Sequence, residues 1–450
     1  MKTHTKKKHK KPNKTRKPKK TRNMRRGGKA LASGGYGCVF TPAIPCLGKQ
    51  RNQAKLRTKI SKLMRREDAV EEYNELQKIT PYVKEIPHYD SYFLLNDIEL
   101  CKPQALTKKD LESYDTKCKP LLEDGITSYN INSNLDRLYM LNMPYGGMEL
   151  GEFIRKAVHK NQFIDINNAL ISLLIKGILP MNEKRIYHCD IKDSNILVDK
   201  TGGGGGKWQT RIIDWSLAGK STDGVIPEMI VGRPIQFNMP FSIILYNSVL
   251  DQMLSEFLKK NPSPNYESLR VFVHEYIYQW KLKRGIGHME TVDKIISILY
   301  GKSLKVNRKG KDSSLEFGES YYYIVNYLTT LLHAFTVNGR FDLLKYTEDV
   351  FLRIADVYGF LTCYLSFFEV LHYSMKSPVN EKICDAIKEL LMKYLFSPRT
   401  EAYDITELEK ELRGLNSLFA KMTWIQDSVS EKYVSMNYIK QPVTVTPLKT

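Results

Sequence analysis

The spacing of apolar residues divides this chain into a first third with short strand-like runs and a longer, mostly helical remainder. Residues 59–64 (KISKLM) and 138–144 (LYMLNMP) are short apolar runs typical of strands. Residues 66–79 between them have helical periodicity. Helical periods dominate from residue 241 onward. The pattern therefore predicts a mixed α and β chain whose strands come first.

The chemistry-bearing residues gather in two strings, HCDIKDSNILVD from residue 188 and RIIDWS from residue 211. Phosphoryl transfer passes through a loose, highly charged transition state, so a protein that catalyses it must position a nucleophile and neutralise oxygens. Asp190 would accept or orient a hydroxyl proton, and Lys192 would reach the phosphate. Asn195 and Asp214 would supply the oxygen ligands that Mg²⁺ prefers. Such a string also arises by chance in a basic, Asn-rich chain, so other motifs must support it.

A glycine cluster lies upstream of both strings. Residues 31–40 read LASGGYGCVF, with Gly34, Gly35 and Gly37 followed by Val39. Glycine lets the backbone approach a phosphate closely, so a hairpin of this composition can cover a nucleotide. A glycine cluster alone is usually a turn. Its place ahead of the two strings favours the nucleotide interpretation.

A lysine and a glutamate between these motifs predict an ion pair. Lys62 lies in the first strand-like run, although Lys55 and Lys59 nearby leave a surface-charge interpretation open. Glu72 falls on the apolar face of the following helix, where an unpaired carboxylate would be costly, so we expect it to pair with Lys62. Glu75 is the second candidate. The apolar residues of that face are Ala69, Leu76 and Ile79.

The second strand-like run ends in a connector. Pro144 and the pair Gly146 and Gly147 interrupt it before a helix start at ELGEFI. An apolar connector with a polar tip would suit contact with adenine. An ordinary strand-to-helix turn is the alternative for this segment alone.

In this order, the motifs over residues 28–240 resemble a eukaryotic-type serine/threonine protein kinase. The strings ISKLM, YHCDIKDSNIL, IIDWS and RPIQFNMPFS are similar to divergent kinases of large nucleocytoplasmic DNA viruses. The resemblance implies an α+β, bilobal protein-kinase-like fold. The expected parts are a basic tail (1–28), a β-rich N-lobe with one main helix (29–142) and an insert around 85–135, a mainly helical C-lobe (143–400), and a helical extension with a loose tail (401–450).

The resemblance also implies transfer of the γ-phosphoryl group of ATP to Ser or Thr hydroxyls of protein substrates, with Mg²⁺ or Mn²⁺ as the metal. Asp190 would be the catalytic base, Lys192 and Asn195 would complete the catalytic set, and Asn195 and Asp214 would hold the metal. Leu141 would be the gatekeeper, and Met143 would offer backbone hydrogen bonds to adenine. The implied ATP-binding residues are Leu31, Gly34, Gly35, Gly37, Val39, Lys62, Glu72, Leu141, Met143 and Leu197.

Two other functions compete with this one. A pseudokinase scaffold would bind ATP without efficient phosphotransfer, but all five charged or polar catalytic positions are present here. A small-molecule kinase of the choline or aminoglycoside type shares the His-x-Asp and a downstream Asn. Those enzymes lack a lysine two residues after the aspartate, and Lys192 occupies that place.

Some residues depart from the family pattern. Ala32 replaces the first glycine of the loop, and Ile60 stands where a small alanine usually meets adenine. Cys189 replaces the arginine before the catalytic aspartate, so a phosphorylated activation loop would lose its usual anchor. We therefore expect activity that does not depend on phosphorylation of Ser221 or Thr222.

The segments after the catalytic loop depart further. The metal-binding motif reads Asp214-Trp215-Ser216, and loss of its glycine predicts a segment less prone to flip. RPIQFNMPFSIILYN, residues 233–247, stands where an Ala-Pro-Glu motif is expected, which puts the peptide-substrate platform in doubt. TGGGGGK, residues 201–207, is expected at a hairpin tip before Asp214.

Charge is concentrated at the N-terminus. The net charge is +20, and the first 30 residues hold 15 Lys and Arg and no acidic residue, which leaves +5 for the rest. Such a tail is expected to be disordered. It would bind a nucleic acid or other polyanion, act as a nuclear-import signal, or simply be solvated. An intracellular site is expected, in the host cytoplasm or nucleus or inside a virion if the chain is viral.

The cysteines and the most apolar segment bear on the compartment. Seven cysteines are scattered without regular spacing, which suggests a reducing compartment and argues against zinc or a disulfide framework. The N-terminus has no apolar core of a secretory signal. Residues 357–371 are apolar but short and contain Glu369, so they predict a buried helix and no membrane contact.

Overall fold

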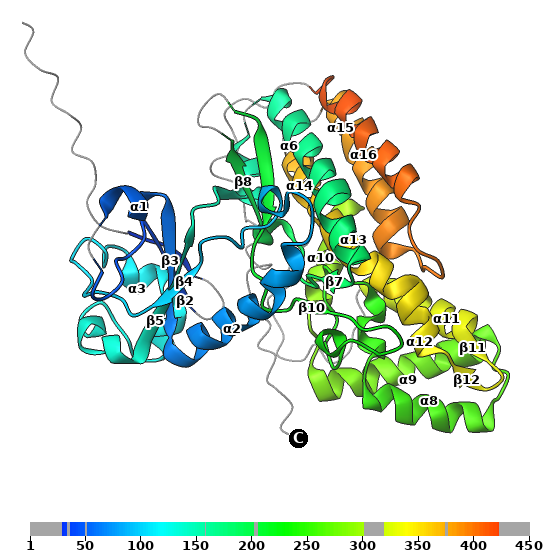
Figure 1. Ribbon diagram of the computed structural model, residues 1–450. Helices are drawn as coiled ribbons and strands as arrows, with labels where there is room; N and C mark the ends of the chain where they lie inside the picture. The colour runs from blue at the N-terminus through cyan, green and yellow to red at the C-terminus, as the bar shows by residue number, and fades with distance from the viewer. Residues whose placement is uncertain are drawn as a thin grey trace, which may run out of the picture.

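The computed structural model describes residues 29–33, 37–49, 52–157, 159–201, 206–300, 319–373 and 377–422. Over these residues the protein is α+β, 57% helical, with small antiparallel sheets. The strand-rich N-terminal part lies beside the helical C-terminal part (Figure 1). The predicted basic tail, Gly34, Gly35 and the loose tail beyond residue 432 lie outside the described residues.

A five-stranded antiparallel sheet forms the N-terminal part, in the order β1-β2-β3-β5-β4. Both strands expected from the apolar runs, β3 and β5, are confirmed at its centre. The first two strands, β1 and β2, lie on either side of residues 34–36 in the sequence and pair antiparallel. The strand bounds are β1 Lys29–Ser33, β2 Gly37–Thr41, β3 Lys59–Arg65, β4 Glu99–Cys101 and β5 Leu138–Pro144.

Register divides the sheet into two faces. Lys62 on β3 lies opposite Val39 on β2 and Leu141 on β5, so these three side chains share one face. Helix α2, Arg66–Val83, packs against β3 and β5. Its predicted inward residues Ala69, Leu76 and Ile79 are buried, as expected from their spacing.

The other face of the sheet is covered by the segment expected to be an insert. Residues 85–135 contribute β4 to the sheet and form short helices, among them α3, Tyr114–Lys117, and α4, Lys119–Glu123. Tyr114, Leu121 and Ile126 are buried in a second core against the β-strands. The segment is therefore an integral layer of the N-terminal part rather than a surface appendage.

Two disulfides tie this layer to the sheet and contradict the expectation of seven unpaired cysteines. Cys38 on β2 is bonded to Cys118, and Cys46 to Cys101 on β4. Cys189, Cys363 and Cys384 are free and buried. Sequence spacing did not reveal the pairs, because the partners are separated by 80 and 55 residues and are brought together only by the sheet.

Helices build the C-terminal part around one long buried helix. The segments α12, Leu343–Tyr346, η8, Thr347–Phe351, α13, Leu352–Thr362, and α14, Tyr364–Tyr373, follow one another with almost no break. Residues 357–371 are buried, which confirms the buried helix predicted there. Among the described residues, Lys160–Glu183 and Leu343–Tyr373 are long and apolar enough to cross a membrane; the apolar window of the second is entirely buried inside the protein, as in a core helix.

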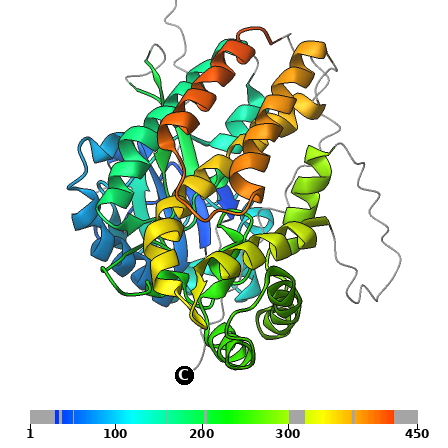
Figure 2. The same cartoon turned by 90° about the vertical axis from the view of Figure 1, so that its right-hand side faces the viewer.

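Other helices surround the long helix. The run α6, η4 and α7 packs on it from one side, and α15 and α16 lie side by side on the outer surface (Figure 2). Helix α16, which lies in the expected helical extension, ends at Phe419. The bounds are α5 Leu150–Lys156, α6 Lys160–Leu173, η4 Leu174–Ile178, α7 Leu179–Glu183, α15 Pro378–Leu391, η9 Met392–Phe396 and α16 Ile405–Phe419.

A group of four helices precedes the long helix, and we call it the α8–α11 segment. Its α9 packs against both α8 and α11, and α10 packs against α11 (Figure 1). The strand pair β11, Thr336–Val337, and β12, Arg340–Phe341, connects it to α12. The helices are α8 Ser248–Lys260, α9 Tyr266–Arg284, α10 Met289–Leu299 and α11 Glu319–Phe335.

Small strands surround the loops that carry the chemistry. β6, Met148–Glu149, β8, Ile196–Lys200, and β9, Trp208–Ile212, form one sheet, and β8 pairs directly with β9. The hairpin expected around the glycine run is therefore confirmed, with residues 202–205 outside the described ones. β7, Ile186–Tyr187, pairs with β10, Gly219–Lys220.

The disulfides predict a definite peptide map. Under non-reducing conditions we expect proteolysis of alkylated protein to yield Cys38 linked to Cys118 and Cys46 linked to Cys101. Reduction should lower the free energy of unfolding by roughly 4 kcal/mol per bond lost, because each bond closes a long loop. Mass spectrometry and denaturant unfolding with and without reductant check this. Finding all seven thiols alkylated in native, unreduced protein would contradict the pairing.

Candidate active site

The predicted lysine–glutamate pair forms between the sheet and helix α2. Lys62 Nζ donates to both Glu72 carboxylate oxygens, at 2.8 and 2.6 Å. Both side chains are mostly buried. Glu75, the second candidate, instead bonds Lys78 at the surface, and Lys59 pairs with Asp97. The inward position on α2 thus selects Glu72, as the helical period indicated.

The carboxylate of Asp190 is held on both oxygens. Lys192 Nζ donates to Oδ2 at 2.7 Å, and Asn195 Nδ2 donates to the same oxygen at 2.9 Å. Asn238 Nδ2 donates to Oδ1 at 2.8 Å. Donors on both sides fix the plane of the carboxylate and leave its outer lone pairs for an incoming group. Sequence analysis found the first three residues and missed Asn238, which lies 48 residues away from Asp190.

A buried aspartate on the long helix supports the loop from below. Asp356 accepts from the backbone N–H of His188 at 2.9 Å and of Cys189 at 2.8 Å, one on each carboxylate oxygen. Asn182 Nδ2 also donates to it at 2.8 Å. Asp356 was not predicted as a site residue, although one signal was present. It is a carboxylate inside the apolar run LRIADVYGFL, where a buried charge requires partners.

Side chains from separate elements of the structure influence the pKa of Asp214. Burial raises the pKa of this carboxylate, but the positive charges of Lys62, Lys192 and His188 and a hydrogen bond from Ser216 lower it below the ordinary value overall. We attribute the outcome to the two lysines, because the Asp214 side chain is still reached by solvent, which weakens the penalty of burial. Asp214 is therefore ionised at neutral pH. Its φ of 63° places it in the left-handed region, a local strain seen at functional sites.

The residues around Asp214 are suited to a divalent cation. Asn195 uses its Nδ2 on the backbone and side chain of Asp190, which leaves its amide oxygen Oδ1 as the end that can act as a ligand. Together with the Asp214 carboxylate it offers the hard oxygen donors that Mg²⁺ prefers. The backbone joins the two ligands, since Ile213 N–H donates to the Asn195 carbonyl at 2.9 Å.

Another group of possible ligands lies in the N-terminal layer. Cys46, Glu99 and Cys101 have ligand atoms within 4.8 Å of one another. The two sulfurs are bonded to each other, so they are not the thiolates that a soft metal requires. This group therefore does not add to the site.

The predicted nucleotide-contacting residues lie on the face of the sheet shared with Lys62. Val39 and Leu141 flank Lys62 directly, and Met143 lies opposite Ile60 in the next row. Leu141 is fully buried, whereas Leu31 on β1 is half exposed. The described part of the glycine loop is tightly packed, because a Cβ at Gly37 would meet the Leu63 carbonyl oxygen at 2.5 Å.

The connector after β5 packs directly on β8. A Cβ at Gly146 would meet the Leu197 side chain at 2.5 Å, and one at Gly147 would meet the Val198 carbonyl oxygen at 2.0 Å. Only glycine fits these close approaches, and the φ of Gly147 is 102°. Leu197 therefore lies beneath the connector, on the side of the C-terminal part.

Arg185 anchors the segment after Asp214 at Ser221 and Asp223, and Glu348 in turn holds Arg185. Arg185 binds Glu348 through two hydrogen bonds of 2.9 and 2.8 Å and pairs with Asp223 at 2.7 Å. It also donates to the hydroxyl of Ser221, which is buried. Cys189 is buried as well, and burial raises the pKa of its thiol, so it remains neutral. A cation is therefore present near this segment, but it comes from Arg185 and already has anionic partners.

The segment that replaced the expected Ala-Pro-Glu motif is buried along its whole length. All residues from 232 to 247 are buried. Arg233 donates to the Cys189 carbonyl oxygen at 2.9 Å, and burial lowers the pKa of its guanidinium. Tyr276 of α9 donates to the carbonyl oxygen of Ile244, so the α8–α11 segment covers this stretch.

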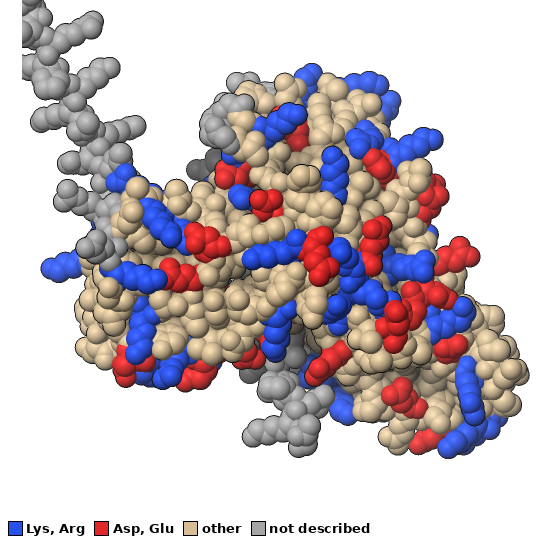
Figure 3. Space-filling model, in the orientation of Figure 1, with Lys and Arg blue, Asp and Glu red and all other residues tan. Residues whose placement is uncertain are grey.

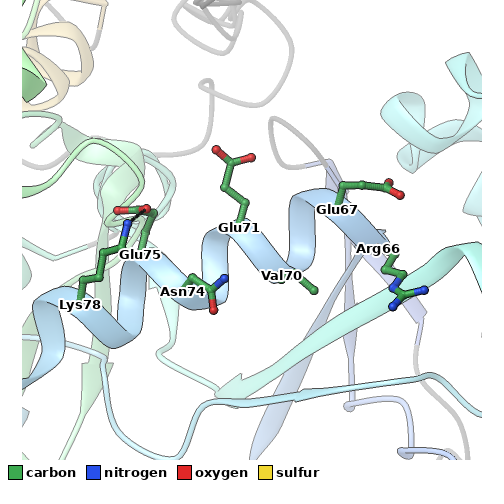
Figure 4. Close-up of a pocket in the computed structure, with 7 residues that line it drawn as sticks. All are labelled: Arg66, Glu67, Val70, Glu71, Asn74, Glu75 and Lys78. Atoms are coloured by element: carbon green, nitrogen blue, oxygen red, sulfur yellow. Dashed lines mark hydrogen bonds and ion pairs between the residues drawn. The ribbon is translucent and has the colours of Figure 1, made fainter.

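A hollow lies on the outer side of α2. Its volume is about 730 Å³, and its lining residues all belong to that one helix (Figure 4). None of the predicted site residues lines it. The lining residues are Arg66, Glu67, Val70, Glu71, Asn74, Glu75 and Lys78. The hollow is thus an open surface feature and not the site formed by Lys62, Asp190 and Asp214.

No protein-family model matches this chain, and no curated protein matches it. The function has to be argued from the contacts above.

Replacement of the buried aspartate tests its support of the loop. Asp356→Asn keeps the shape but replaces one acceptor oxygen by the NH2 of an amide, which is a donor, so one of the two backbone N–H groups loses its acceptor. We expect a loss of roughly 1 to 3 kcal/mol in unfolding free energy. Asp349→Asn, on the same helical run but exposed and paired only with Lys345, is the control and should cost less than about 0.5 kcal/mol. Equal effects in urea unfolding would contradict the assignment.

The anchoring of the segment after Asp214 by Arg185 predicts that activity does not depend on phosphorylation of Ser221 or Thr222. If the protein transfers phosphoryl groups, as its resemblance to protein kinases implies, Ser221→Ala with Thr222→Ala should leave that rate near the wild-type value, because Asp223 and Glu348 already pair with Arg185. Arg185→Ala should lower the rate, since it releases both contacts. Steady-state rates of the three proteins check this. Abolished activity in the double alanine variant would show that a phosphate is needed after all.

Proposed function

We propose that this protein is a serine/threonine protein kinase with a bilobal protein-kinase-like fold, which transfers the γ-phosphoryl group of ATP to protein hydroxyls. The N-terminal sheet with α2 would be the small lobe, and the helical part would be the large lobe. The observation that carries the proposal is the set of contacts on the Asp190 carboxylate, which Lys192, Asn195 and Asn238 hold. The same Lys192, together with Lys62 of the sheet, also lowers the pKa of Asp214. Three motifs far apart in sequence converge on one carboxylate, as phosphate and metal binding require.

Each polar group has a role in the proposed reaction. Lys62, held by Glu72, would contact ATP phosphates, while the sheet face with Val39, Leu141 and Met143 would receive adenine. Mg²⁺, or Mn²⁺, would neutralise phosphate charge when held by Asn195 and Asp214. Asp190 would orient the acceptor hydroxyl and take its proton.

The lysine of the catalytic loop would act on the transferring group. Lys192 lies against Asp190 and near Asp214, so its charge would fall on the phosphoryl group as it moves between them. The presence of Lys192 two residues after Asp190 also favours a protein kinase over a small-molecule kinase, since small-molecule kinases lack that lysine.

The basic tail would serve a separate purpose. The first 30 residues account for +15 of the net charge of +20, and the face of the protein shown in Figure 3 carries positive and negative side chains interspersed. Contact with nucleic acid or with an import receptor is the role that we propose for the tail. The two disulfides remove the cysteine argument for a reducing compartment, so an intracellular location rests on the basic tail alone. Substrate proteins would meet the large lobe beside Asp190.

A transfer assay tests the proposed function. Purified protein with radiolabelled ATP, Mg²⁺ and a mixed panel of protein substrates should label serine or threonine. Asp190→Ala and Lys62→Ala should lower the rate at least about 100-fold, because they remove the base and a phosphate contact. Lys78→Ala is the matched control, since Lys78 is also ion-paired with a glutamate of α2 but at the surface, and it should retain the rate.

Other results would point elsewhere. Mg-ATP binding in a thermal-shift assay without transfer to any protein would favour the pseudokinase scaffold. Label that persists in Asp190→Ala but is lost in Lys62→Ala would refute the assigned base. Label that persists in both variants would indicate a contaminating kinase.

A further inference from the structure

The loop between α9 and α10 reaches the residues that hold the catalytic carboxylate. It consists of Gly285, Ile286, Gly287 and His288, and it belongs to the α8–α11 segment. His288 N–H donates to the Ile235 carbonyl oxygen at 2.8 Å. A Cβ at Gly287 would lie 2.3 Å from that same oxygen, so the loop and residue 235 are in the closest contact that backbones allow.

The side chain of His288 extends the contact by two residues. Its Nδ1 accepts from Phe237 N–H at 3.4 Å, and its ring lies 5.4 Å from the Phe237 ring. Burial lowers the pKa of His288 to about 4, with Lys192 and Arg233 lowering it and Asp190 raising it. The imidazole is therefore neutral at pH 7, and Nδ1 keeps a lone pair to accept with.

The contacted residues lead directly to Asp190. Asn238 follows Phe237 and donates to Asp190 Oδ1 at 2.8 Å and to the Ile191 carbonyl oxygen at 3.3 Å. On its other side, a Cβ at Gly359 of the long helix would meet the Asn238 carbonyl oxygen at 3.1 Å. Asn238 is fully buried. Its position thus depends on the long helix on one side and on the α9–α10 loop acting through residues 235–237 on the other.

We propose that the α9–α10 loop is a brace that positions Asn238, and through it the Asp190 carboxylate, for phosphoryl transfer. Gly287 and His288 are positioning residues in this account, because they touch neither nucleotide nor acceptor. The proposal rests on the proposed function for its catalytic consequence, while its structural content is independent of that function.

Two glycines of the loop provide a matched pair of variants. Gly287 and Gly285 both have positive φ, 53° and 79°, so alanine strains the backbone at either position. At Gly287 the added Cβ would also press on Ile235 at 2.3 Å, about 1.1 Å short of an ordinary contact at 3.4 Å, whereas at Gly285 it meets nothing within 4 Å. Both changes therefore strain the backbone, and only Gly287→Ala also displaces residue 235.

We expect Gly287→Ala to lower kcat roughly 10- to 100-fold with the KM for ATP unchanged, because a displacement near 1 Å at the reacting geometry has costs of that size. Gly285→Ala should retain the wild-type kcat although its Tm falls at least as much, because Gly285, with φ 79° and ψ −179°, adopts a conformation that is essentially restricted to glycine. Hydrogen–deuterium exchange should become faster over residues 233–239 in Gly287→Ala only. Asn238→Ala should reproduce the fall in kcat without the change in KM.

The outcomes separate the brace from the enzyme activity. Equal kcat in both glycine variants, whether retained or lost, would overturn the brace, as would unchanged exchange over residues 233–239 in Gly287→Ala. If the wild type transfers no phosphate, the proposed function fails. The exchange measurement then still decides whether the loop holds residues 235–238.

Discussion

The site depends on one buried carboxylate, that of Asp356. The backbone N–H groups of His188 and Cys189 lie where the loop turns away from β7, and there they need an acceptor inside the protein. A charge in this interior is tolerated only because three donors surround it. The helix α13 that carries Asp356 is buried at every described position except Arg353, so it can be a rigid reference for the loop. The fixed backbone at His188 and Cys189 in turn positions the side chains of Asp190 and Asn195, which come next in the chain.

Positive and negative side chains alternate in the site that lies next to Asp356. Lys62 contacts Glu72, and both it and Lys192 act on Asp214, while Lys192 also contacts Asp190. Each of the two lysines thus interacts with two carboxylates. Because the pairs come from different elements, their alignment requires the sheet, α2 and the loops to keep fixed relative positions. The docking of residues 92–94 on β9, with Phe93 edge-on to Trp215 at 5.4 Å, joins the two parts beside this site.

Sequence reasoning reached the residues whose role depends on local spacing. The period of α2 was enough to select Glu72, and the string around Asp190 contained its own hydrogen-bonding partners Lys192 and Asn195. Residues whose role depends on distant partners were missed. Asn238 lies in a segment with no helix or strand period, and the disulfide partners are far apart along the chain. The covering of residues 232–247 could not be foreseen either, because burial there comes from α9 and α11 rather than from the segment's own pattern.

The distance along the chain between Asp356 and the loop it supports affects how the protein forms. The two backbone contacts span 168 and 167 residues, with the whole α8–α11 segment in between. During synthesis from the N-terminus, all the predicted motifs leave the ribosome long before their support does. A nascent chain that ends ahead of the long helix has every predicted side chain of the site but lacks the acceptor for the backbone N–H groups of His188 and Cys189. Contacts of such long range also slow folding, so assembly of the site falls among the last events of folding.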